Sequence, residues 1–362
     1  MAAPLNTQPP PAAAAATAVD FSQLDPQQVL DALQAVGLHG DGRVLQLNSY
    51  ENRVFQVFLE DSSAVVVKFY RPGRWSDEQI VEEHAFALEL AAAEVPVIAP
   101  LVLRSDLELP GLTLQGTPAT LACLHSTDHQ GRLVRAQRFA VAARSAGREP
   151  ELEDPAVMQQ IGRFIGRLHA VGRRCPFVHR HHLNTHTDGQ GAMRLLLDGG
   201  FVTDAERPAW QQACGQALAA VDAAFDAAPP LATLRLHGDC HLGNVLWRGN
   251  AEGGSPHVVD LDDAMQGPAV QDLWMLVSGD RQTMAAQLNL LLEGYEQFSD
   301  FDDRERALIE PLRTLRMVRH SAWLAARWAD PTFPRNFPFF GSAAYWGQQT
   351  TQLREQIEAM AA

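Results

Sequence analysis

Short apolar runs separated by polar turns predict a sheet in the first part of the chain. Residues 44–48 and 53–59 flank the polar turn 49–52, and a third run, 64–70, carries Lys68. Runs of this length, rich in β-branched and aromatic residues, are typical of strands. Three later runs predict further strands, over residues 97–103, 121–124 and 139–143.

A helical spacing of apolar residues dominates the rest of the chain. In residues 154–172, Val157, Ile161, Phe164 and Leu168 recur every three or four positions, which predicts an amphipathic helix. Similar patterns predict helices over residues 25–36, 76–94, 209–227 and much of 282–362. Strands followed by helices indicate an α+β fold.

The same patterns predict the organisation of the chain. Residues 1–19 are rich in Ala and Pro and read as a flexible tail. The last of the predicted strands ends at residue 143, and the chain then turns polar, which indicates a boundary. Arg and Glu, with a Gly and a Pro, dominate residues 144–153, which is typical of a linker.

The most informative stretch lies in the helical half. It reads His237-Gly238-Asp239-x-His-x-x-Asn244, followed by an apolar run, a polar turn and a second apolar pair that ends at Asp260. Asp, Gly and Asn are ordinary turn residues, so a lone His-Gly-Asp would indicate only a turn. The complete pattern is far more specific than that.

This pattern suits phosphoryl transfer, which depends mainly on positioning and charge neutralisation. One carboxylate must orient or deprotonate the attacking hydroxyl, and Asp239 fits that role. Oxygen ligands must hold Mg²⁺ against the phosphates, and Asn244 and Asp260 fit the role of metal ligands. Two protein ligands are enough, because Mg²⁺ keeps several of its waters. Asp262 and Asp263 either reinforce the metal site or only solvate the loop.

The stretch resembles the catalytic loop of the aminoglycoside phosphotransferase/choline kinase-like family, a branch of the protein-kinase-like fold. His237-Gly238-Asp239 is similar to the kinase H-R-D motif, and Asp260 to the D-F-G aspartate. Within the family, the match is strongest to bacterial stress-response protein kinases. Supporting stretches lie at residues 47–54, 66–72, 270–276 and 335–338. The resemblance implies a bilobal kinase-like α+β fold with ATP as co-substrate. It divides the chain into a small, β-rich N-terminal lobe over residues 20–143 and a larger, helical C-terminal lobe over residues 144–362.

The resemblance also assigns roles in the N-terminal lobe. Lys68 is expected to bind the α- and β-phosphates and to pair with a helix glutamate, because a lysine in an apolar strand needs a partner. Glu83 falls where the family places that partner, with Glu82 as runner-up and Glu89 as a further candidate. The turn with Ser49 has no G-x-G-x-x-G, so its backbone N–H groups and the Ser49 hydroxyl would contact the phosphates, unless it is a plain hairpin turn.

Other residues have supporting or open roles. We expect Asp272 to accept backbone N–H groups and brace the catalytic loop, with a helix cap as the alternative. His169 is expected to be structural. Cys240 is redox-sensitive only if it is exposed with a lowered pKa. The histidine-rich segment 179–186 is read as a solvated loop rather than a metal site.

Composition restricts the possible partners. A net charge of −14 over 362 residues argues against nucleic acid and anionic membrane as partners. No run of about eighteen apolar residues would span a bilayer, and the N-terminus is a poor signal peptide. The four cysteines form no C-x-x-C pair, which fits a reducing compartment. We therefore expect a cytoplasmic monomer.

Taken together, the motifs predict an ATP- and Mg²⁺-dependent protein serine/threonine kinase with a role in stress response. One alternative is a small-molecule phosphotransferase acting on an aminoglycoside, choline, homoserine or a similar alcohol. A second is a nucleotide-binding pseudokinase that serves as a scaffold. The presence of Asp239, Lys68, Asn244 and Asp260 together disfavours the pseudokinase.

Overall fold

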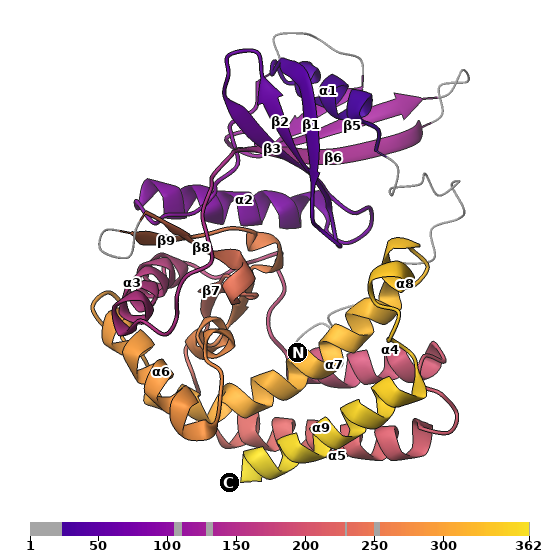
Figure 1. The fold of residues 1–362 in the computed structure, drawn as a ribbon, viewed down its shortest axis with the longest axis vertical. Helices are drawn as coiled ribbons and strands as arrows, with labels where there is room; N and C mark the ends of the chain where they lie inside the picture. The colour runs from indigo at the N-terminus through magenta and orange to yellow at the C-terminus, as the bar shows by residue number, and fades with distance from the viewer. Residues whose placement is uncertain (1–23, 105–110, 128–132, 229, 250–253, 362) are drawn as a thin grey trace, which may run out of the picture. The chain divides into compact units, whose positions relative to one another are not determined.

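The computed structural model describes residues 24–104, 111–127, 133–228, 230–249 and 254–361 (Figure 1). The tail predicted over residues 1–19 lies outside the described residues. The chain forms two compact units, Met1–Trp75 with Leu101–Val141, and Ser76–Pro100 with Ala142–Ala362. Residues 76–100, which we assigned to the N-terminal lobe, thus group with the second unit.

The first unit is built on a six-stranded sheet in the order β1-β2-β3-β6-β5-β4. Its strands are β1 (Gly40–Leu47), β2 (Arg53–Leu59), β3 (Ala64–Phe69), β4 (Leu112–Gln115), β5 (Leu121–Thr127) and β6 (Leu133–Ala143). Helix α1 (Pro26–Ala35) packs Val29 and Leu33 against Val57, Val67 and Phe139 of the sheet, and all five side chains are fully buried.

One predicted strand is wrong. Residues 97–103 form only isolated bridges, such as that between Pro100 and Ala142. Pro96 and Pro100 lack the backbone N–H groups that a continuous ladder needs, which explains the interruption. The sheet instead gains β4, which the sequence pattern did not predict, and a β6 that begins well before residue 139.

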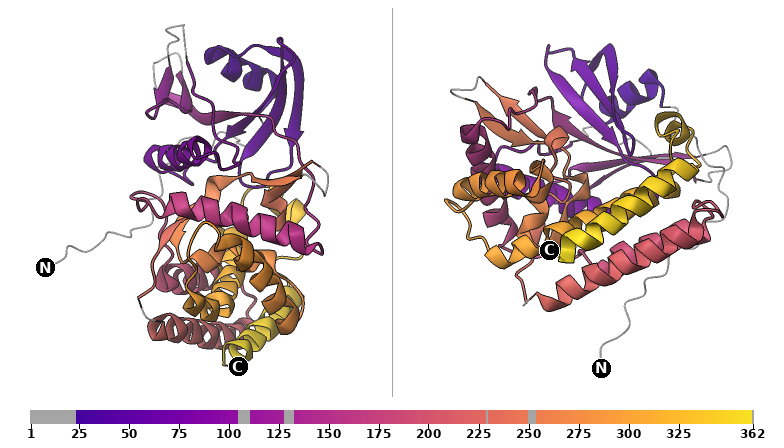
Figure 2. Two further views of the ribbon diagram at one scale, coloured as in Figure 1. Left: turned by 90° about the vertical axis from the view of Figure 1, so that its left-hand side faces the viewer. Right: turned by 60° about the horizontal axis from the view of Figure 1, so that its bottom comes forward.

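The second unit is mainly helical. Its helices are α2 (Asp77–Ala92), α3 (Pro155–Gly172), α4 (Ala192–Asp198), α5 (Arg207–Ala227), α6 (Arg281–Tyr295), α7 (Ile309–Ala326), α8 (Thr332–Asn336) and α9 (Ala343–Ala361). Helices α5, α7 and α9 lie alongside one another (Figures 1 and 2) and share a core that includes Trp210, Leu315 and Trp346. The predicted α+β, kinase-like fold is confirmed.

Helices α3 and α6 approach each other closely because glycines line their contact. A Cβ added at Gly162 would lie 1.9 Å from the backbone oxygen of Leu291, and one at Gly294 would lie 1.9 Å from that of Gln159. No side chain fits at such distances. The close approach fixes α3, which carries His169, relative to the segment that ends at Tyr295.

Two short antiparallel ladders frame the catalytic stretch. β7 (Leu234–Leu236) pairs with β10 (Met265–Gly267), and β8 (Val245–Arg248) pairs with β9 (Ser255–Val258). The loop 237–244 connects β7 to β8, and Asp260 follows β9. The two ladders therefore hold both halves of the predicted motif.

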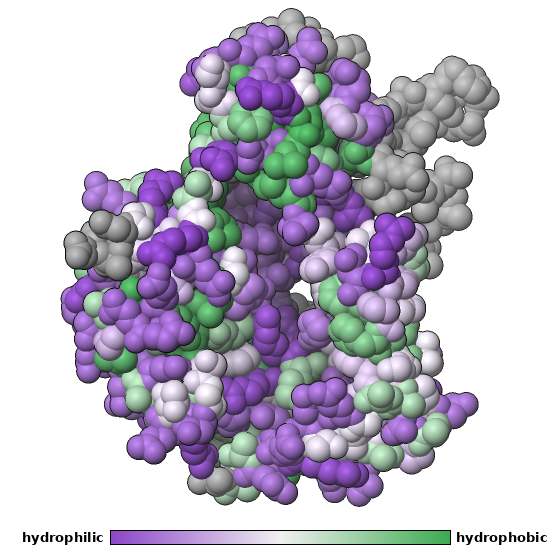
Figure 3. All heavy atoms as spheres, in the orientation of Figure 1, coloured by the Kyte–Doolittle hydropathy of each residue, from purple (hydrophilic) through white to green (hydrophobic). Residues whose placement is uncertain are grey.

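The face of the molecule drawn in Figure 3 is largely polar. Hydrophilic residues dominate the face in view, and apolar residues appear in scattered patches (Figure 3). In the part of the chain that the structure describes, no helix has the length and apolar character needed to cross a membrane.

Candidate active site

The catalytic loop begins with a turn that requires glycine. Gly238 has a φ of 85°, and a Cβ there would lie 2.2 Å from the backbone oxygen of Asp263. Positive φ is readily adopted by glycine alone. The Gly of the His-Gly-Asp motif therefore lets the loop pass close to the segment after Asp260.

Asp272 braces this loop. Its two carboxylate oxygens accept the backbone N–H groups of His237 and Gly238 at 2.7 and 2.8 Å. His169 lies 3.0 Å from the same carboxylate and contacts the Tyr295 hydroxyl at 2.9 Å through its other ring nitrogen. The bracing role predicted for Asp272 and the structural role of His169 are both confirmed. The helix-cap alternative for Asp272 is wrong, because it ends a 3₁₀ turn.

His237 connects the base candidate to the second half of the motif. Its Nδ1 accepts the backbone N–H of Asp239 at 3.3 Å, and its Nε2 donates to the backbone oxygen of Val259 at 2.9 Å. The backbone N–H of Val259 in turn donates to the backbone oxygen of Asn244 at 3.0 Å. The loop and the strand end before Asp260 are thereby fixed to each other.

Asn244 lies on the loop with its amide group oriented by the backbone. Its Nδ2 donates to the backbone oxygen of Asp239 at 2.9 Å. The Oδ1 atom is the amide's remaining acceptor, and it is the oxygen a hard cation would bind.

Asp260 adopts a left-handed backbone conformation, with φ 62° and ψ 67°. This conformation costs a non-glycine residue about 1 kcal/mol or more, and such strain gathers at functional sites. The residue is exposed, as a carboxylate that meets a hydrated metal must be. The described residues hold no group of three or more His, Cys, Asp or Glu that would bind a metal. A site built on Asn244 and Asp260 therefore stays a prediction.

Two side chains, Arg316 and His241, contact the Asp239 carboxylate. Arg316 of α7 forms an ion pair with one carboxylate oxygen, and His241 Nε2 lies 3.4 Å from the other. His241 Nδ1 accepts the N–H of Gly243, which leaves Nε2 to carry the proton that it donates to Asp239. Burial raises the pKa of Asp239, but the hydrogen bond from His241 and the charge of Arg316 lower it more, so this pKa lies below its usual value.

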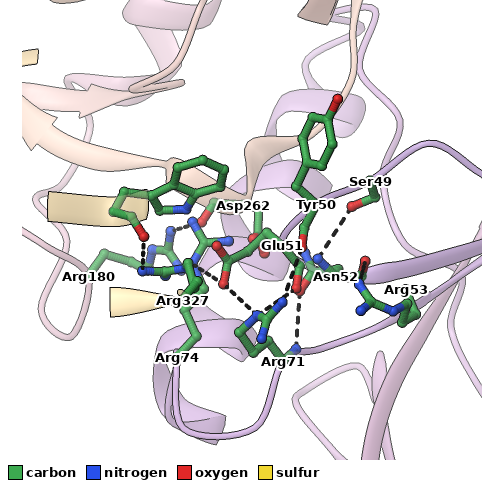
Figure 4. A network of polar contacts seen from close by, with 11 residues as sticks. Ser49, Tyr50, Glu51, Asn52, Arg53, Arg71, Arg74, Arg180, Asp262 and Arg327 are labelled. Atoms are coloured by element: carbon green, nitrogen blue, oxygen red, sulfur yellow. Dashed lines mark hydrogen bonds and ion pairs between the residues drawn. The ribbon is translucent and has the colours of Figure 1, made fainter. Parts of the chain in front are cut away.

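In the first unit, the turn 49–52 is held by Arg71. The Arg71 side chain donates to the backbone oxygens of Tyr50 and Glu51 at 3.1 and 3.0 Å, and its backbone N–H donates to Asn52 Oδ1 at 3.2 Å (Figure 4). The Glu51 carboxylate pairs with Arg71 at 3.2 Å. Two stretches that separately carry the family resemblance therefore meet here.

Ser49 lies at the start of this turn. Its Oγ accepts the backbone N–H of Asn52 at 3.3 Å, so its own O–H is still able to donate. The turn joins the paired antiparallel strands β1 and β2, as a hairpin turn does. Contact with phosphates stays a prediction.

Lys68 lies on β3 opposite Val54. Its neighbours Val67 and Phe69 point into the buried core, so Lys68 is half-buried on the other face of the sheet. Its ammonium lies 5.3 Å from the centre of the Tyr70 ring.

Glu82 and Glu89 of α2 contact other segments of the second unit. Glu82 accepts the backbone N–H groups of residues 178–180 at 2.5 to 2.8 Å, and Glu89 pairs with Arg235 at 2.7 Å. Glu83 is 5% exposed and lies 3.7 Å from the His84 ring. Because Lys68 belongs to the first unit and Glu83 to the second, their pairing stays a prediction.

The condition for redox sensitivity at Cys240 is not met. Its side chain is buried, and burial raises its pKa well above the usual value. The histidine-rich segment is not only a loop, because residues His186–Gly191 form a helical turn that continues into α4. In this segment, His181 pairs with Asp188 at 2.9 Å and His182 contacts the Phe177 backbone oxygen at 2.8 Å.

Comparison with known proteins agrees with this geometry. A family model described as "Phosphotransferase enzyme family" matches residues 43–309, which include Ser49, Lys68, the catalytic loop and Asp272. The chain belongs to this phosphotransferase family.

The phosphotransferase has close relatives over almost its full length. It is 42% identical over 344 residues to "Stress response kinase A" of Escherichia coli (strain K12), covering 95% of this chain and 96% of the relative. It is 42% identical over 343 residues to "Serine/threonine protein kinase RdoA" of Salmonella typhimurium (strain LT2), covering 95% of both chains. The predicted resemblance to stress-response kinases is confirmed.

Solved structures share the fold of the phosphotransferase at low identity. An amicoumacin kinase in complex with AMP-PNP, Ca²⁺ and Ami has a TM-score of 0.67 at 17% identity, covering 93% of this chain and 94% of that one. A microcompartment-associated aminopropanol kinase has a TM-score of 0.66 at 16% identity, covering 93% and 97%. At such identities the likeness concerns the fold alone.

The sequence patterns did not identify two arginines that contact the motifs, Arg316 at Asp239 and Arg71 at Glu51. Arg316 lies 77 positions from Asp239, and Arg71 lies 20 from Glu51. A weak signal existed for Arg316, since Arg313, Arg316 and Arg319 recur at helical spacing along α7. That spacing alone does not indicate which group an arginine faces.

Proposed function

We propose that the chain is an ATP-dependent protein serine/threonine kinase with a cytoplasmic role in stress response. The family and the names of its relatives support this reading, and they extend over nearly the whole chain. The observation that carries it is the catalytic loop itself, in which Asp272 fixes the backbone that presents Asp239 beside Asn244.

In this proposal Asp239 orients the acceptor hydroxyl and takes its proton. The lowered pKa keeps the carboxylate ionised, and His241 and Arg316 hold it in one orientation. A weakly basic carboxylate suits a loose transition state, in which little proton transfer is needed before the phosphoryl group moves.

Asn244 and Asp260 would hold Mg²⁺. The donor set fits this ion, because both residues offer hard oxygen atoms and Asp260 is exposed. The metal would neutralise charge on the nucleotide phosphates. Lys68, paired with Glu83, would bind the α- and β-phosphates, and the turn with Ser49 would cover them.

The curated relatives at 42% identity are named as stress response or serine/threonine protein kinases, so we do not adopt the small-molecule alternative. The proposal is tested by incubating the purified protein with γ-labelled ATP, Mg²⁺ and a dephosphorylated bacterial protein extract. We expect label on Ser or Thr by phosphoamino-acid analysis. Transfer to small alcohols without any labelled protein would overturn it.

A further inference from the structure

A cavity of about 350 Å³ lies beside the proposed base. It is lined by His241 of the catalytic loop, by Arg313 and Arg316 of α7, and by apolar residues that include Trp274 and Met284. Its position next to Asp239, which Arg316 and His241 both contact, is where an acceptor hydroxyl must approach.

Arginine side chains supply the charged groups of this cavity wall, and each is paired with a carboxylate. The lining, among the described residues, contains two arginines and a histidine but no carboxylate. Glu310 and Asp239 pair with the two arginines from outside the lining. Each guanidinium has more N–H donors than its carboxylate partner uses, so an anionic group can share it, whereas the lining offers a cationic acceptor no carboxylate.

Contacts with three neighbouring side chains fix the position of the Arg313 guanidinium. Its Nη1 pairs with both Glu310 oxygens at 3.0 and 3.1 Å, and its guanidinium lies 5.5 Å from the centre of the Trp274 ring. Its Nη2 also contacts the Met284 sulfur at 3.3 Å. An arginine fixed on three sides loses little conformational entropy when it binds an anion.

Arg316 is the more accessible of the two. Its side chain is 42% exposed, and the ion pair with Asp239 uses only one of its five N–H donors. A guanidinium therefore lies within reach of both the base and an acidic group on a neighbouring part of the acceptor.

We infer that this cavity binds an acidic side chain that flanks the acceptor hydroxyl, so that the acceptor is an acidic Ser/Thr-containing peptide segment. The inference rests on the proposed function and names the acceptor class of the same site. Arg313 and Arg316 bind the carboxylate, and Trp274 and Met284 contact its aliphatic part.

The test compares Ser peptides that share one core sequence and carry acidic, neutral or basic flanking residues. We expect kcat/KM for the acidic peptide to exceed that for the neutral one by at least about tenfold, mainly through KM, and the preference to weaken as salt is raised. The basic peptide should be the poorest acceptor.

Substitutions of Arg313 test whether the cavity causes the preference for acidic peptides. Arg313→Gln should lower the acidic preference roughly tenfold through KM, and Arg313→Lys should retain most of it. Arg306→Gln, which removes a surface arginine paired with Asp303, should leave the preference unchanged. Melting temperature and ATP binding identify any variant that fails to fold.

The outcomes separate this inference from the proposed function. Equal labelling of all three peptides would overturn the inference and leave the kinase assignment in place. An Arg313→Gln variant with a uniformly lower kcat on every peptide would also overturn it, since the arginine would then act on the phosphoryl group. Labelling of no peptide at all, with ATP still bound, would overturn the proposed function and the inference together.

Discussion

Arg316 forms an ion pair with Asp239, the proposed base, from a helix 77 positions further along the chain. Together with the hydrogen bond from His241, the pair explains how the Asp239 carboxylate keeps a pKa below its usual value despite the burial that opposes this. It also joins α7 to the catalytic loop, so that the C-terminal part of the chain participates in the site.

The first prediction concerns pH dependence. In Arg316→Gln the pKa of Asp239 should rise toward its usual value, since one of the two groups that lower it is lost. Because only the ionised carboxylate serves as base, activity is lost as the pH falls through this pKa. The acidic limb of the kcat/KM profile should therefore move to higher pH. A limb that stays in place would mean that Arg316 does not control the base.

The second prediction concerns the brace. Asp272→Ala removes an acceptor for two buried N–H groups and a partner of His169. We expect a loss of roughly 3 kcal/mol of unfolding free energy, since buried donors would be left unsatisfied. Urea denaturation measures it. The control Asp303→Ala, whose side chain is 79% exposed, should change stability by less than about 0.5 kcal/mol.

The third prediction concerns the contact between α3 and α6. Gly162→Ala should destabilise the protein by about 3 kcal/mol, since its Cβ would overlap the Leu291 backbone. Gly215→Ala, on α5 with no atom within 4 Å of the added Cβ, should stabilise it by about 0.5–1 kcal/mol. Thermal unfolding compares the two. Equal effects would contradict the close approach of the helices.

The fourth prediction concerns the turn 49–52. Arg71→Ala removes the side-chain donors that hold the backbone of Tyr50 and Glu51. If the turn covers the nucleotide, KM for ATP should rise roughly tenfold, because the turn loses its preorganisation. Arg43→Ala, which breaks a local pair with Asp41, is the matched control and should leave KM for ATP unchanged. An unchanged KM in both variants would remove the turn from the nucleotide site.

Features that depend on residues close together in the sequence were predicted better than contacts between residues far apart in it. Asp239 and Asn244 lie five positions apart, and their shared loop followed directly from the spacing. The brace by Asp272 was also predicted, because the resemblance extends through that residue. The strand expected at 97–103 failed because apolar periodicity ignores Pro100 within it and Pro96 just before it.

The contacts that a site residue makes with residues of other helices and strands could not be predicted. The sequence does not specify that α7 directs Arg316 rather than another arginine toward Asp239. Nor does it show that the Glu82 carboxylate accepts the backbone N–H groups of residues 178–180. Such contacts depend on tertiary packing, which periodicity does not encode.

The most direct test of the account is a comparison of Asp239→Asn with the unaltered protein. Phosphoryl transfer from labelled ATP to protein and equilibrium binding of ATP with Mg²⁺ are both measured. We predict a fall in kcat of about a thousandfold or more, with the Kd for ATP changed by less than roughly threefold. Turnover close to that of the unaltered protein would contradict the assignment of Asp239 as the base and with it the proposed mechanism.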